Sequence, residues 1–260
     1  MEKTALLQSI SEATTAEELK QLFVHVVETD DNEITQAFYN KVTSIIQTVE
    51  DVDSFTEFNE LIYTGLCVGD VIDDDQLENL EQVFTGQLKS VIAKADLKKL
   101  NALKDLIESI EEEDVEKTFL NQFKTAILTA ISESNDVAAL KAIAEEIANA
   151  NYDFNKDDQN ELAQAFLVKL KAVIELTKDP AIMLSIKELV DDESLGFYNF
   201  SLTSERDTEA TDAITAQVKT IIKENNAAAL TDNSSFKKLV DEIEDDDVTQ
   251  AFEEKTETAQ

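Results

Sequence analysis

The chain has 260 residues, of which only four are glycine and one, Pro180, is proline. Sheets and barrels need many more turn residues, so the composition excludes a β-rich fold and favours long helices joined by short turns. The 56 acidic residues outnumber the 22 basic ones, and Arg206 is the only arginine. This charge balance argues against nucleic acid or an anionic membrane as a partner.

Hydrophobic residues make up 43% of the chain, enough for a packed core, so the chain is not a disordered acidic tail. The single cysteine, Cys67, cannot form an internal disulfide. The first residues lack a basic start followed by an apolar run, and no apolar stretch approaches the roughly 18 residues of a membrane span. We therefore expect a soluble, cytoplasmic protein.

One helical pattern recurs along the chain at intervals of 35 to 48 residues. An aromatic or β-branched anchor stands in an apolar stripe with members four residues before it, four after it and seven to eight after it. We call the predicted element helix B. Its anchors are, in chain order, Phe38, Phe84, Phe119, Phe166, Ile214 and Phe252.

A second pattern, apolar at relative positions 0, 3, 4 and 7, precedes each helix B, as at Leu19, Leu22, Phe23 and Val26. We call this predicted element helix A. Since one helix pair cannot bury its own apolar stripe, copies must stack. The sequence predicts an all-α fold with one repeat domain over residues 1–260, an α–α superhelix of six pairs: 14–46, 53–92, 96–131, 135–174, 180–222 and 231–260.

In unit length and helix-pair layout the whole chain resembles α–α repeat proteins of the HEAT and armadillo kind. It does not carry the consensus of those families, or the Trp, Gly and Pro positions of tetratricopeptide repeats, so no individual residue can be carried over. The resemblance implies a solenoid that serves as a protein-binding scaffold.

Three of the connections between helix A and helix B are long: residues 63–79, 148–161 and 191–209. Connections of this kind emerge on one side of a solenoid, which we call the A–B edge. Two of them carry aromatic residues in polar surroundings: Tyr152, Phe154, Phe197, Tyr198 and Phe200. These aromatics either cover an apolar gap or anchor a protein partner, because interface centres favour aromatic side chains.

Acidic clusters come before each helix B or open the connection to it. Carboxylates there cap helix N-termini, and together they would also form a negative ridge that attracts a basic protein segment. The carboxylates on the long connections that we assign to partner binding are Asp73, Asp74, Asp75, Asp157, Asp158, Asp191 and Asp192. Lysines five residues after the anchors are predicted to pair with neighbouring carboxylates on the solvent side: Lys89, Lys124, Lys171 and Lys219.

No catalytic residue, metal ligand or cofactor site is predicted. His25, the only histidine, stands in the apolar stripe of the first helix A, where a packed and hydrogen-bonded residue is expected rather than a catalyst. One His and one Cys cannot build a usual zinc site. Residues 153–161 resemble a calcium loop, but the sixth-position glycine and the final bidentate Glu are missing. Four scattered glycines make no phosphate-binding loop.

The sequence thus favours a non-enzymatic scaffold whose A–B edge binds a protein with a basic or amphipathic segment. The preference for lysine over arginine and the tail carboxylates Glu253, Glu254 and Glu257 resemble type IV-translocated bacterial effectors, which implies a host-cell protein as partner. The alternatives are an acidic inhibitor that mimics nucleic-acid charge and, less favoured, an enzyme with its site in the long connections. The oligomeric state is not predicted.

Overall fold

The computed structural model describes residues 2–29, 31–66, 71–150, 154–191 and 204–257, and these are helical almost throughout. No strand occurs among them, which confirms the predicted all-α fold. Contacts divide the chain into two compact units, an N-terminal unit of residues 1–123 and a C-terminal unit of residues 124–260. Each unit is described by itself.

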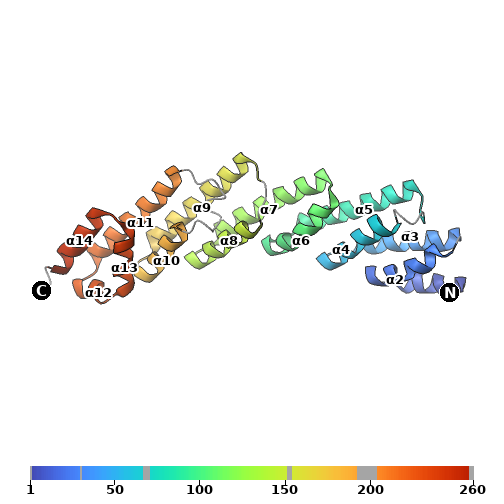
Figure 1. Cartoon of the computed structure of the whole chain (residues 1–260), viewed down its shortest axis with the longest axis horizontal. Helices are drawn as coiled ribbons and strands as arrows, with labels where there is room; N and C mark the ends of the chain where they lie inside the picture. Colours follow the sequence, from blue (N-terminus) through green and yellow to red (C-terminus); the bar gives the residue numbers. More distant parts are fainter. Residues whose placement is uncertain (1, 30, 67–70, 151–153, 192–203, 258–260) are drawn as a thin grey trace. The chain divides into compact units, whose positions relative to one another are not determined.

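The N-terminal unit runs from blue to green in Figure 1 and contains one π-helical turn, η1, directly after α4. Its elements are α1 (Lys3–Glu12), α2 (Ala16–Val27), α3 (Asn32–Ile46), α4 (Val52–Glu60), η1 (Leu61–Leu66), α5 (Asp74–Ile92), α6 (Leu97–Ile110) and the first half of α7 (Glu113–Glu133).

The C-terminal unit begins inside α7 and ends with the red helices of Figure 1. Its further elements are α8 (Val137–Ala150), α9 (Lys156–Leu176), α10 (Pro180–Asp191), α11 (Ser204–Glu224), α12 (Ala227–Thr231), α13 (Ser234–Ile243) and α14 (Asp246–Glu257). The sequence pattern did not indicate the short α12.

Within each unit the helices form two layers. In the N-terminal unit α2, α4 and α6 pack in succession, as do α1, α3 and α5 in the other layer. In the C-terminal unit the successions are α8, α10, α13 and α9, α11, α14. This arrangement is compatible with stacked helix A–helix B pairs. The first five helix B anchors are buried, and the sixth, Phe252, is half-buried against Phe236 with ring centroids 5.7 Å apart.

A side-chain donor three residues after every anchor ties each helix B to the one before it or, for α3, to α1. The donor is an amide or an ammonium group, and the acceptor is a main-chain carbonyl at the C-terminal end of that earlier helix or just beyond it. The six hydrogen bonds are Lys41–Ser11 (2.8 Å), Gln87–Val49 (2.8 Å), Gln122–Ala95 (3.1 Å), Lys169–Ser132 (2.9 Å), Gln217–Thr177 (2.7 Å) and Lys255–Lys223 (3.2 Å). They satisfy carbonyls that helix ends leave without an intrahelical partner.

The helices extend further into the three long connections than the apolar pattern indicated. Residues 61–66 continue α4 as the π-helical turn, and α5 begins at Asp74, well before its first buried residue, Leu80. A capping box explains this early start: Asp73 Oδ1 accepts from the Gln76 amide at 2.8 Å, and Gln76 Oε1 accepts from the Asp73 amide at 3.4 Å. Likewise α8 continues to residue 150, α9 begins at 156 and α11 begins at 204.

Two glutamates adopt a left-handed backbone conformation where a helix A ends in a short turn. Glu111 has φ 52° at the end of α6, and Glu244 has φ 50° at the end of α13. Glycine is favoured in this conformation because a Cβ atom crowds the following carbonyl. We expect Glu111→Gly to raise the free energy of unfolding by about 0.5–1 kcal/mol, measured by urea denaturation. A loss of stability in Glu111→Gly would contradict this account.

Candidate functional site

The A–B edge exists as a shared side within the N-terminal unit. Two side-chain pairs join the N-terminal halves of α3 and α5: Gln76 Nε2 donates to Gln36 Oε1 at 3.1 Å, and Tyr39 Oη donates to Asn79 Oδ1 at 2.9 Å. The bends that lead into these two helices therefore lie on the same side of the unit.

Some members of the acidic clusters are helix caps. Asp31, Asp73 and Asp245 accept hydrogen bonds from main-chain amides in the first turns of α3, α5 and α14, at 2.8 to 3.0 Å. The amide of Val248 is the main reason that the pKa of Asp245 lies below its ordinary value. At α9 the cap is Asn155, and Asp157 lies exposed in the first turn. Capping thus accounts for one carboxylate in several clusters and leaves their neighbours to other roles.

In the C-terminal unit, a lysine on one helix B pairs with carboxylates at the N-terminal end of the next helix B. The nitrogen–oxygen distances are 2.6 Å for Lys124–Asp158, 2.9 Å for Lys124–Glu161, 3.2 Å for Lys171–Glu209 and 3.3 Å for both Lys219–Asp245 and Lys219–Asp247. The hydrogen bond to Asp158 raises the pKa of Lys124 above its ordinary value. The predicted pairing is confirmed for these three lysines, whereas Lys89 forms no ion pair with any described residue.

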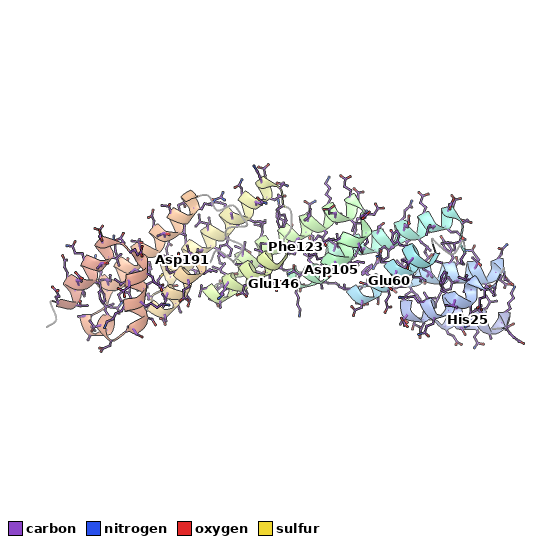
Figure 2. The ribbon with its side chains drawn as sticks, in the orientation of Figure 1. His25, Glu60, Asp105, Phe123, Glu146 and Asp191 are labelled. Carbon is purple, nitrogen blue, oxygen red and sulfur yellow. The ribbon has the colours of Figure 1, made fainter. Side chains whose placement is uncertain are left out.

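Asp191 lies at the C-terminal end of α10 (Figure 2). It pairs with Lys187 one turn earlier in the same helix. Lys187 is 9% exposed, so Asp191 is the counter-charge of a lysine whose side chain is largely buried. This internal contact gives Asp191 a structural role beside the partner-binding role that the sequence suggested.

We expect Asp191→Ala to lower the free energy of unfolding by about 1 kcal/mol, because it leaves the largely buried Lys187 side chain without its partner. The second change Lys187→Met should restore most of this loss, since a buried apolar side chain needs no counter-charge. Urea denaturation of the single and double variants measures the difference. Equal losses in Asp191→Ala and in the double variant would show that the ion pair is not the cause.

The N-terminal unit holds an acidic cluster with no basic counterpart among the described residues. It consists of Glu78 and Glu81 on α5 and Glu112 in the bend between α6 and α7, with Tyr63 of η1 beside them. Burial, then the charges of Glu112 and Glu78, raise the pKa of Glu81. Burial, then Glu81 and Glu112, raise the pKa of Tyr63 to about 12, so its phenol stays neutral. We call these four residues the Tyr63 cluster.

Sequence reasoning missed the Tyr63 cluster because its members are far apart in the chain. A signal was present: the helix A pattern loses its fourth apolar position at Gly65, where the chain forms the π-helical turn that carries Tyr63. A Cβ atom on Gly65 would lie 3.3 Å from Cε1 of Phe23, so the small residue lets η1 approach α2. Single π-helical turns inside helices are frequent at functional sites.

Asp73, Asp74 and Asp75 are all exposed at the start of α5, on the helix that carries Glu78 and Glu81. Asp73 is engaged as the cap. Asp74 and Asp75 form no ion pair with any residue that the structure describes. The described part of this edge therefore carries carboxylates that are free to meet a cationic group.

Of the predicted aromatic anchors, only Phe154 falls in the described part of the chain. It is 8% exposed, and its carbonyl accepts from Gln159 Nε2 at 2.8 Å. Its burial fits the interpretation that it covers an apolar gap. Tyr152, Phe197, Tyr198, Phe200 and Asp192 lie outside the described residues.

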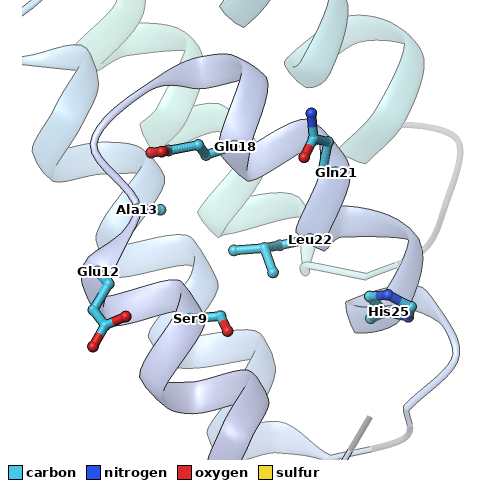
Figure 3. A pocket seen from close by; sticks show the side chains of 7 residues that line it. All are labelled: Ser9, Glu12, Ala13, Glu18, Gln21, Leu22 and His25. Atoms are coloured by element: carbon cyan, nitrogen blue, oxygen red, sulfur yellow. The ribbon is translucent and has the colours of Figure 1, made fainter.

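His25 differs from the packed, hydrogen-bonded residue that we expected. Its side chain is 41% exposed, and its Nδ1 atom has no hydrogen-bond partner, with Glu28 Oε2 3.7 Å away. The ring borders a hollow of about 390 Å³ between α1 and α2 (Figure 3). The apolar stripe of α2 places His25 at the margin of the stripe, where the hollow leaves the ring uncovered.

Within the described ranges, no group of three or more His, Cys, Asp or Glu side chains is arranged to hold a metal ion. No described helix is both long and apolar enough to cross a membrane. In comparisons with known proteins, no family model matches the chain and no curated protein matches it.

Proposed function

We propose that the protein is a non-enzymatic scaffold that binds a protein partner through the A–B edge of its N-terminal unit. The observation that carries this proposal is the Tyr63 cluster, in which part-buried Glu81 lies in the field of the charges of Glu112 and Glu78, and no described lysine pairs with any of the three. A lysine or arginine from a partner would remove this repulsion. The neutral Tyr63 ring adds a face for a cation–π contact and a hydroxyl donor.

The contrast with the C-terminal unit supports the choice of edge. There lysines pair at 2.6 to 3.3 Å with at least one carboxylate at the N-terminal end of each of α9, α11 and α14. Exposed Asp74 and Asp75 extend the negative surface of the N-terminal unit beyond the Tyr63 cluster. A nucleic-acid mimic needs a regular row of free carboxylates, and the lysine bridges interrupt such a row. This difference favours capture of a short basic segment.

The experiment measures binding of a fluorescein-labelled peptide of alternating lysine and glycine to the whole chain by fluorescence anisotropy. Glu81→Gln/Glu112→Gln should weaken binding by about tenfold, and a rise in salt from about 50 to 200 mM should weaken it further. The matched control is Glu209→Gln/Asp247→Asn, which removes two carboxylates already bridged by lysines. The control should change the affinity by less than about twofold.

Two results would refute the proposal. Equal losses in the two double variants would mean that the peptide senses only the total charge of −34. Binding that does not respond to salt would mean that charge does not recruit the peptide. Circular dichroism of each variant checks that the helices are retained.

A further inference from the structure

The hollow between α1 and α2 is open at a position where the packing of both units places another helix. Three A helices lie both against their own helix B and against the next helix A: α2 on α3 and α4, α8 on α9 and α10, α10 on α11 and α13. The same packing would place a helix A against α1 and α2, and this is the place of the hollow (Figure 3).

Leu22 shows that this place is incompletely covered. It is the second apolar position of the helix A pattern, and the five equivalent residues in the other pairs are at most 7% exposed: Leu61, Leu106, Ile143, Leu189 and Leu239. Leu22 alone of these six is part-exposed, and it lines the hollow beside Ala13. An apolar side chain from outside would bury Leu22 as its equivalents are buried.

The rim of the hollow is acidic. Glu12 and Glu18 line it, together with Ser9, Gln21 and His25, and no lysine or arginine does. Amide and hydroxyl donors of Thr14 and Thr15 hold the pKa of Glu18 below its ordinary value, at distances down to 2.6 Å, so this carboxylate stays ionised. A cationic group on the occupant would therefore meet negative charge at the rim.

The chain itself shows how two A helices are joined. Lys20 of α2 pairs with Glu60 of α4 at 2.6 Å, and Lys238 of α13 pairs with Glu188 of α10 at 3.0 Å. In both cases the apolar stripes are packed and one lysine–glutamate pair lies at the surface. A helix that fits the hollow should therefore have an apolar stripe to pack against α2 and a basic residue to pair with a surface carboxylate.

We infer that the hollow between α1 and α2 is a docking site for an amphipathic α-helix of a partner protein, with an apolar stripe flanked by lysine or arginine. The helix lies in the hollow as an additional helix A, buries its stripe on Leu22, and directs its cations to Glu12 and Glu18. The carboxylates of the rim disfavour a second copy of this chain, whose net charge is −34. This site is separate from the Tyr63 cluster and does not depend on it.

The probe is a fluorescein-labelled peptide with the sequence of α6, residues 97–110, in which Asp105 and Glu108 are replaced by lysine. Its binding to the whole chain is measured by fluorescence anisotropy. A second peptide has Leu100, Leu103 and Ile107 replaced by serine as well, which removes the apolar stripe, and should bind at least about tenfold more weakly.

Leu22→Arg places bulk and positive charge in the hollow. It should weaken binding of the lysine-containing probe by at least about tenfold. Glu12→Gln changes an exposed side chain and leaves the core untouched, and it should weaken binding of the probe by about threefold. The matched control is Ile182→Arg on α10, where the replaced side chain is 43% exposed, and this variant should bind the probe as tightly as the wild-type chain.

Glu81→Gln/Glu112→Gln should retain at least half of the wild-type affinity for this probe. That result would separate the hollow from the Tyr63 cluster on the A–B edge.

Three outcomes would overturn the inference. The first is a probe that does not bind the wild-type chain, and the second is one that binds Leu22→Arg as tightly as Ile182→Arg. The third is a wild-type chain that sediments as a dimer and becomes monomeric in Leu22→Arg, because a second copy would then be the occupant of the hollow.

Discussion

Phe84→Ala is expected to lower the free energy of unfolding of the N-terminal unit by about 3–5 kcal/mol. Phe84 is the helix B anchor of α5 and is fully buried. Its ring meets Phe55 of α4 edge-on, with centroids 5.8 Å apart, so the side chain joins the two layers of the unit. Truncation removes the buried ring and leaves a cavity that the rigid helices can only partly close.

Urea denaturation measures the total effect, and hydrogen exchange resolves the N-terminal unit from the C-terminal one. Phe84→Leu, which keeps most of the volume, should cost clearly less. Val168→Ala serves as the matched surface control, because that side chain is 59% exposed and its truncation should change the stability by less than about 0.5 kcal/mol. The packing account fails if Phe84→Ala costs no more than Val168→Ala.

Gln87→Leu is expected to lower the free energy of unfolding by about 1–2 kcal/mol, because it leaves the Val49 carbonyl without its donor. The half-buried Gln87 side chain donates to this carbonyl at 2.8 Å. Gln87→Lys should keep most of the stability, since Lys41, Lys169 and Lys255 make the equivalent bond in other pairs.

The comparison of leucine with lysine at position 87 separates the hydrogen bond from packing, because both changes remove the native amide and keep a long aliphatic side chain. Urea denaturation of the two variants and the wild-type chain gives the difference. If lysine destabilises the protein as much as leucine, the bond to the carbonyl is not what the recurring donor contributes.

Part of the candidate site could be predicted from the sequence. The acidic residues before each helix B pointed to the A–B edge, and the recurrence of Lys124, Lys171 and Lys219 predicted the ion pairs that the structure contains. The recurring donor was also visible, since glutamine or lysine follows each anchor by three residues. Its acceptor was not, because a main-chain carbonyl has no sequence signature. The aromatics Tyr152, Phe197, Tyr198 and Phe200 stay a prediction.

The single solenoid of six stacked pairs also stays a prediction, because the contacts group the chain into two units whose boundary in the sequence falls between residues 123 and 124. Each unit on its own has the two layers that stacked pairs require. The early start of α5 at Asp74 shows why the boundaries were less predictable than the helices. Apolar periodicity marks where a helix packs, whereas its first turn depends on capping.

The sequence by itself determined where the A and B helices pack and which of their residues form the core, because the periodicity of buried side chains is a local property of the chain. Only the tertiary structure decided which charges meet. Tyr63, Glu81 and Glu112 come together through the packing of η1, α5 and the α6–α7 bend. Likewise, the exposure of Leu22 depends on which helix lies against it, and not on the apolar pattern that Leu22 shares with five buried equivalents.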